Sequence, residues 1–136
     1  MKHSFEDKIY YSDTDCYGVV WHGAYTRWVE RSRTEFCNMF LDVQQFEKEG
    51  TRFPLVELNF RYKAFAKLFD EIIVETILLE IKKTTMSFET KIIDKNTGKV
   101  FVIAVSTLVT TNQEGKLNKQ IPQEIIEKLS SELVTY

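Results

Sequence analysis

The sequence is poor in the residues that build disulfide frameworks and metal sites. It holds two cysteines, Cys16 and Cys37, and two histidines in 136 residues. Two cysteines do not make a disulfide framework, so stability must come from a hydrophobic core, and a reducing cytoplasm is the expected compartment. Because His3 lies at the end of the chain, His22 is left as the main histidine candidate, and we expect no metal.

Long apolar runs and a strong charge imbalance are also missing. No apolar stretch approaches the length that crosses a bilayer, and the first eight residues lack the apolar core of a secretion signal. The net charge is -2, which gives no electrostatic reason to expect nucleic-acid binding. We therefore expect a cytoplasmic protein with no membrane span and no nucleic-acid partner.

The composition is that of one globular domain. Apolar residues make up 43% of the chain and charged residues 28%, and the length suits a single core over residues 1–136. Apolar positions have helical spacing from Ala24 to Leu41 and alternate with polar ones in the later segments. The pattern predicts an α+β fold with an antiparallel sheet. The expected strands are 5–11, 56–62, 70–82, 86–94 and 100–111, and the expected short helices are 43–49 and one that starts at Pro122.

The stretch from Tyr11 to Tyr25 concentrates the chemistry of the chain. Asp13 and Asp15 would point the same way in an extended segment, and Gly18 permits a sharp turn because glycine tolerates positive φ. His22 follows just before the long helix, whose first N–H groups suit an anionic or strongly polarised oxygen. This arrangement is compatible with general-base or nucleophilic catalysis, and equally with acids that only cap a turn or a helix.

Other uses of these residues are less well supported. A calcium loop starting at Asp13 would need oxygen ligands at Tyr17 and Ala24, so it is rejected. A zinc site would have to use His22, the two aspartates and Cys16, which is a weak set. A nucleophilic pair of Cys16 and His22 lacks any flanking signature.

The spacing Tyr-x-Asp-Thr-Asp-x-x-Gly-Val-Val-x-His-x-x-Tyr, followed by Trp28-Val29-Glu30 and Arg33 to Phe36, resembles the hot-dog-fold acyl-CoA thioesterases. The resemblance is to the 4-hydroxybenzoyl-CoA thioesterase type, most closely its Tol–Pal-associated bacterial branch. It implies a curled antiparallel sheet wrapped around one long central helix, an acyl-CoA substrate and no cofactor. It also implies homodimers, often doubled to homotetramers, with sites at the subunit interface.

The resemblance assigns roles to particular residues. Asp15 matches the catalytic carboxylate, acting as general base or nucleophile, and His22 would orient the acyl group or the attacking water. Independently of the resemblance, we expect Asp13 to support the loop. The helix start, rather than the resemblance, offers the amides of Gly23 and Ala24 to polarise the thioester carbonyl. Residues expected to contact the substrate are Trp21, Gly23, Ala24, Tyr25 and Glu30.

Several points stay open at this level. Glu30 and Arg33 would form a surface pair, or Glu30 would reach into the site. Near strand ends, cations that could meet the phosphates of CoA, or simply be solvated surface, are Arg61, Lys63, Lys67, Lys82 and Lys83. Where close relatives usually carry proline after Tyr62, this chain has Ala64-Phe65-Ala66, which puts a pocket wall in doubt. Alternatives to an acyl-CoA thioesterase are a non-catalytic acyl-thioester binding or assembly protein and a thioesterase that acts on acyl carrier protein.

Overall fold

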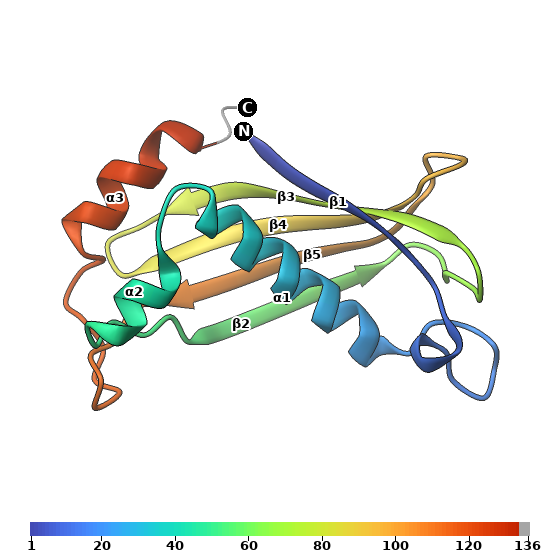
Figure 1. Cartoon of the computed structure of the whole chain (residues 1–136), viewed down its shortest axis with the longest axis horizontal. Helices are drawn as coiled ribbons and strands as arrows, with labels where there is room; N and C mark the ends of the chain where they lie inside the picture. The colour runs from blue at the N-terminus through green and yellow to red at the C-terminus, as the bar shows by residue number, and fades with distance from the viewer. Residues whose placement is uncertain (134–136) are drawn as a thin grey trace.

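The computed structural model describes residues 1–133, so the last three residues of the expected domain lie outside the described part. It confirms the α+β class: one long helix lies across a five-stranded antiparallel sheet of order β1-β3-β4-β5-β2 (Figure 1). The strands are β1 Lys2–Lys8, β2 Leu55–Tyr62, β3 Glu71–Ile81, β4 Thr85–Asp94 and β5 Val100–Val109. The helices are α1 His22–Asn38, α2 Val43–Lys48 and α3 Gln123–Leu129, with 3-10 turns at Tyr11–Asp13 and Ser130–Glu132.

Strands β3, β4 and β5 form the centre of the sheet and bury alternate residues along their length. The period of two arises because successive side chains point to opposite faces, so one face covers the core and the other lies half-buried. A tight turn joins β4 to β5, where Gly98 has a φ of 77° and its amide donates to the carbonyl of Asp94. The hairpin predicted from the turn residues is thus present.

Helix α1 packs mainly against β1, β3 and β4. Its buried side is aromatic, with Tyr25, Trp28 and Phe36 almost fully enclosed. Ser32 is the small residue on this buried side of the helix. Its hydroxyl accepts a 2.6 Å hydrogen bond from the Thr76 hydroxyl in the sheet below. This close approach fixes the helix over one side of the sheet and leaves the side near β2 less covered.

Strand β2 is an edge of the sheet. Lys63 donates its N–H to the carbonyl of Phe101, which continues the register in which Asn59 faces Val105. Because hydrogen-bonded pairs alternate in an antiparallel ladder, Asn59 also uses its backbone groups toward β5. The N–H and C=O groups of Leu58 and Phe60 therefore point outward along the open edge.

Some element ends differ from the sequence prediction. The first strand stops at Lys8 because the chain turns at Tyr10, whose N–H donates to the Asp13 carboxylate. The long helix starts at His22 and ends at Asn38, after which Leu41 closes a turn onto the carbonyl of Cys37. Pro122 precedes the terminal helix rather than forming its first residue, and that helix ends at Leu129.

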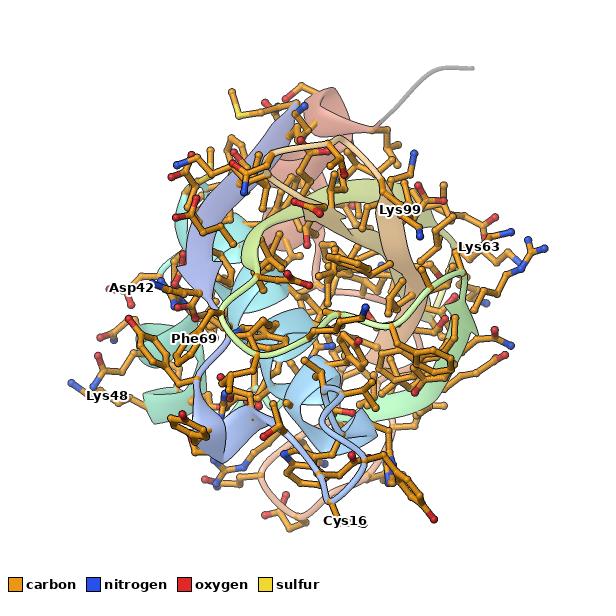
Figure 2. The ribbon with its side chains drawn as sticks, turned by 90° about the vertical axis from the view of Figure 1, so that its right-hand side faces the viewer. Cys16, Asp42, Lys48, Lys63, Phe69 and Lys99 are labelled. Carbon is orange, nitrogen blue, oxygen red and sulfur yellow. The ribbon has the colours of Figure 1, made fainter. Side chains whose placement is uncertain are left out.

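Two segments distant in sequence meet at one end of the sheet. Val20 donates its N–H to the carbonyl of Ala66, and Val19 pairs with Lys67. This end lies at the right of Figure 1 and faces the viewer in Figure 2, with Cys16 at the tip of its loop. Over residues 1–133, no helix is both long enough and apolar enough to cross a membrane.

Candidate active site

Asp15 begins a tight turn between the Asp13 region and α1. Its Oδ1 accepts the Tyr17 N–H at 2.8 Å, its carbonyl accepts the Gly18 N–H, and its own N–H donates to Val19. Gly18 has a φ of 80°, the left-handed conformation expected from the sequence. The residue is exposed, and Oδ2 makes no hydrogen bond within residues 1–133. One carboxylate oxygen is therefore held by the turn while the other stays available.

Asp13 does not point the same way as Asp15, contrary to the extended geometry that we expected. The 3-10 turn at Tyr11–Asp13 rotates its side chain inward, where it is 3% exposed. One carboxylate oxygen accepts the Tyr10 N–H at 2.9 Å, and the other is 2.6 Å from an Arg27 guanidinium nitrogen. These contacts tie the loop to α1, which fits the supporting role.

Replacing Asp13 by Asn is expected to lower the free energy of unfolding by about 1 to 2 kcal/mol, because the charged contact to Arg27 is lost from a buried site. The bond to Tyr10 can remain, so the fold should persist. Chemical denaturation measures this, with Asp42→Asn as the control, since asparagine caps α2 as well as aspartate does. An unchanged unfolding midpoint for the Asp13 variant would contradict the account.

The start of α1 lies beside the Asp15 turn. Trp21 donates its N–H to the carbonyl of Asp13, and its own carbonyl accepts the Ala24 N–H at 3.1 Å. The Ala24 amide is thus engaged, which corrects its expected role as a carbonyl-polarising donor. In residues 1–133, no protein acceptor meets the N–H groups of His22 and Gly23. These two amides are the ones that a substrate oxygen can use.

Trp21 folds back over the helix start. A Cβ placed on Gly23 would lie 2.0 Å from the indole ring, so glycine is what allows this approach. The ring also contacts His22 edge-on, with centroids 5.8 Å apart. Trp21 is 42% exposed and does not line the hollow next to Asp15. Its position covers the Gly23 side of the helix start.

A hollow of about 350 Å³ opens beside these groups. It brings together three residues singled out in the sequence, Asp15, His22 and Tyr25. The other lining residues are Val19, Val20, Tyr62 and Phe65. A carboxylate and an imidazole thus border one space with apolar walls, and the open amides of His22 and Gly23 belong to the adjoining helix start. Such a set can activate water, hold an acyl group and stabilise a developing oxyanion.

Tyr25 forms the floor of this hollow from the first turn of α1. It is 1% exposed, and its hydroxyl accepts the Ala66 N–H at 3.2 Å. Burial raises the pKa of this phenol above its ordinary value of 10.0, outweighing the opposite effect of the Ala66 bond. Tyr25 therefore keeps its proton at neutral pH and can donate it.

Tyr25→Phe should destabilise the fold by about 1 kcal/mol, because it leaves the Ala66 amide without an acceptor. Because the pKa of Tyr25 is higher in the folded state than in the unfolded state, this phenol contributes stability that is fully present below the unfolded pKa. That contribution is lost as the pH rises through the folded-state pKa. The difference in unfolding free energy between wild type and variant should therefore shrink above pH 10.0. Denaturation at neutral and strongly alkaline pH tests this, and a constant difference would argue against a buried phenol that titrates late.

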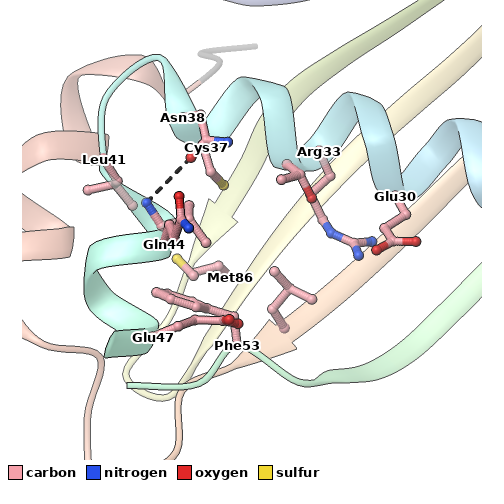
Figure 3. A pocket seen from close by; sticks show the side chains of 12 residues that line it. Glu30, Arg33, Cys37, Asn38, Leu41, Gln44, Glu47, Phe53 and Met86 are labelled. Carbon is pink, nitrogen blue, oxygen red and sulfur yellow. Dashed lines mark hydrogen bonds between the residues drawn. The ribbon is translucent and has the colours of Figure 1, made fainter. Parts of the chain in front are cut away.

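Glu30 lies apart from the Asp15 hollow, so the structure does not support its expected place in the site. It lies eight residues, more than two turns, beyond His22 and borders a second hollow of about 370 Å³ between α1 and α2. Figure 3 shows Glu30 and Arg33 projecting from α1 into that space, opposite Phe53 and Met86. Burial lowers the pKa of the Arg33 guanidinium, although it stays charged.

The sequence reasoning missed the wall contributed by the later chain. Tyr62, at the end of β2, stands 5.8 Å from Tyr25 by ring centroids. Phe65 is 61% exposed and borders the hollow beside it. The sequence held one indication of this wall. Ala64-Phe65-Ala66 stands where close relatives usually carry proline, which put the wall of the pocket in doubt. In the described part of the chain, no three His, Cys, Asp or Glu side chains are grouped to hold a metal ion.

Known proteins share this fold and sequence pattern. The thioesterase-like superfamily matches residues 10–129, and the chain belongs to this family of hot-dog proteins. An acyl-CoA thioesterase, YbgC of Haemophilus influenzae, is 38% identical over 91 residues, covering 65% of this chain and 67% of its own. A putative esterase of Synechocystis is 31% identical over 118 residues, covering 85% of this chain and 71% of its own. A hypothetical protein of Thermus thermophilus has the same fold, with a TM-score of 0.87, 26% identity, and coverage of 99% of this chain and 100% of that one.

Proposed function

We propose that this protein is an acyl-CoA thioesterase, which hydrolyses an acyl-CoA thioester to a free acid and CoA. The observation that carries the proposal is the hollow bordered by the Asp15 carboxylate and His22, at the start of α1 where two amides are open. The match to Haemophilus influenzae YbgC, named an acyl-CoA thioesterase, supports the same class. Within the superfamily, the Tyr11–Phe36 motif favours the 4-hydroxybenzoyl-CoA thioesterase type and its Tol–Pal-associated branch.

Two routes through Asp15 satisfy the chemistry. In the first, Asp15 takes a proton from water as the water oxygen attacks the thioester carbon, and the C–S bond then breaks to release the CoA thiol. In the second, the carboxylate attacks directly, releases the thiolate and forms a mixed anhydride that water cleaves. The His22 and Gly23 amides would receive the developing oxyanion in both routes, and His22 would orient the acyl group or the water.

We propose that the reaction uses no cofactor and no metal, because the Asp15 carboxylate can itself activate water or attack the thioester. Chelator treatment should therefore leave the turnover rate unchanged.

A steady-state comparison of acyl-CoA with the same acyl group on acyl carrier protein tests the carrier. We expect a larger kcat/KM for acyl-CoA, and a preference for the protein carrier would favour the alternative substrate.

The proposal includes a homodimer, formed through the open edge of β2. That strand has no proline or lysine between Leu55 and Tyr62, and its outward backbone groups at Leu58 and Phe60 lack partners in residues 1–133. Open edges of this kind pair readily with another strand. An antiparallel pairing about a two-fold axis would join two sheets into one, and such dimers could double to a homotetramer.

Charges on β2 favour one register of that pairing. With the axis at Asn59, each Glu57 lies opposite Arg61 of the partner subunit, and Leu58 lies opposite Phe60 of the partner subunit. This register overlaps Val56–Tyr62, seven of the eight residues of β2. An axis at Leu58 would leave the charges unmatched, and one at Phe60 would overlap fewer residues. The Asn59 register further sets Val56 of the partner subunit beside Tyr62, so the second chain would complete the wall of the site.

A further inference from the structure

An exposed aromatic patch adjoins the candidate active site and takes no part in the core. It consists of Lys8, Tyr11, Lys67 and Phe69, named here the Phe69 patch. Tyr11 is 72% exposed and Phe69 is 53% exposed, and their rings meet edge to face with centroids 5.6 Å apart. The Lys8 ammonium lies 5.6 Å from the centre of the Phe69 ring. The patch is thus a pair of exposed, nearly perpendicular rings, with the Lys8 ammonium over the Phe69 ring and the more exposed Tyr11 ring beside it.

The conformation of Phe69 is costly for a phenylalanine. Its φ is 68°, and among residues 1–133 it is the sole non-glycine residue with positive φ. It ends a turn in which Asp70 donates to the carbonyl of Lys67 while the Asp70 carboxylate accepts the Lys67 N–H. Glycine would fit this turn better, and a half-exposed ring adds little burial in return. Fold stability therefore does not explain why an aromatic side chain stands here.

Backbone contacts connect the segment that carries the patch to the hollow beside Asp15. Lys67 pairs with Val19, which lines that hollow, and Phe69 donates its N–H to the carbonyl of Ile9, two residues before Tyr11. Four chain steps separate Phe69 from Phe65 at the hollow wall, so their Cα atoms are at most about 15 Å apart. The pantetheine arm of CoA is long enough to span this distance. In Figure 2 Phe69 lies on the far side of this end from Lys63 and Lys99.

We infer that the Phe69 patch binds the adenine nucleotide end of CoA, an inference that rests on the proposed acyl-CoA substrate. A purine ring stacks on an exposed aromatic face, and each such stack contributes substantially to binding. The phosphates of the nucleotide are anions, and Lys8 and Lys67 form no ion pair within residues 1–133. The exposed aromatic rings and the neighbouring cations suit this ligand.

Phe69→Gly is the test variant, because glycine keeps the backbone and removes the ring. KM for acyl-CoA should rise roughly five- to hundredfold, the range of a lost base stack. KM for the matching acyl-N-acetylcysteamine thioester, which has no nucleotide, should not change. The melting midpoint should stay the same or rise, since strain is relieved. Equal changes in KM for both substrates, or none for either, would overturn the inference.

Direct binding separates this inference from the proposed reaction. Adenosine 3′,5′-bisphosphate should bind wild type by calorimetry, bind Phe69→Gly far more weakly, and lose affinity in a Lys8→Gln, Lys67→Gln double variant. Lys99→Gln is the matched control and should bind as wild type does. Binding without any thioester hydrolysis would refute the reaction and keep the site. Hydrolysis of acyl-CoA by a wild-type protein that does not bind the bisphosphate would refute the site. So would a Phe69→Gly variant, or a Lys8→Gln, Lys67→Gln double variant, whose only change is in the mass of the oligomer.

Discussion

Asp15→Asn should lower kcat for the best acyl-CoA substrate by about 10²- to 10⁴-fold, with little change in the melting midpoint. Asparagine can still accept the Tyr17 N–H, so the turn should persist. It can neither take a proton from water nor attack the carbonyl as a carboxylate does. Steady-state rates with purified protein measure the effect.

The matched control for this variant is already in the loop. Asp13→Asn removes a charge two residues away but from the buried contact with Arg27, so it should change stability more than turnover. A loss of turnover in Asp15→Asn together with a loss of stability in Asp13→Asn would separate catalysis from loop support. If Asp15→Asn works within a few-fold of wild type, the carboxylate of Asp15 is not the reacting group.

Asn59→Cys should form an intersubunit disulfide almost completely under mild oxidation, in a background where exposed Cys16 is replaced by serine. In the proposed register the two Asn59 residues face each other as a non-hydrogen-bonded pair, with Cα atoms about 4.5 Å apart. That distance lies within the range of about 4.4 to 6.8 Å that disulfides span. Non-reducing electrophoresis measures the product, and activity should survive the cross-link.

Two further cysteines make this result specific. Glu57→Cys should not cross-link with itself, because its partner in the proposed register is Arg61 of the partner subunit. Phe60→Cys should cross-link only if the axis lies at Phe60. Efficient cross-linking of either variant instead of Asn59→Cys would refute the register, and an active wild-type monomer in light scattering would refute the dimer. A proline at Asn59 is a poorer test, since it removes a bond to β5.

The α+β class and the antiparallel sheet were predictable from local signals, whereas the sheet curled around a central helix was implied only by the resemblance. The spacing of Tyr25, Trp28 and Phe36 fixed the buried side of α1, and alternation marked the central strands. Element ends were less accurate, since they depend on contacts such as Asp13 with the Tyr10 amide. Periodicity carries no information about these capping bonds.

The candidate site was predictable only where the motif is continuous. Asp15, His22 and Tyr25 lie within eleven residues and do meet at one hollow. The different directions of Asp13 and Asp15 depend on Arg27, and the far wall depends on Tyr62 and Phe65, so neither could be read from neighbouring residues. Glu30 shares the helix with His22 but borders another hollow, because more than two helical turns separate them.

Release of free thiol by the purified wild-type protein tests the central claim most directly. A panel of acyl-CoAs with aromatic and short aliphatic acyl groups should be incubated with the protein, with thiol and free acid measured together. We predict release proportional to protein concentration, one thiol for each acid, over many turnovers. Binding of acyl-CoA with no thiol release from any member of the panel would contradict the account and favour a non-catalytic acyl-thioester binding protein.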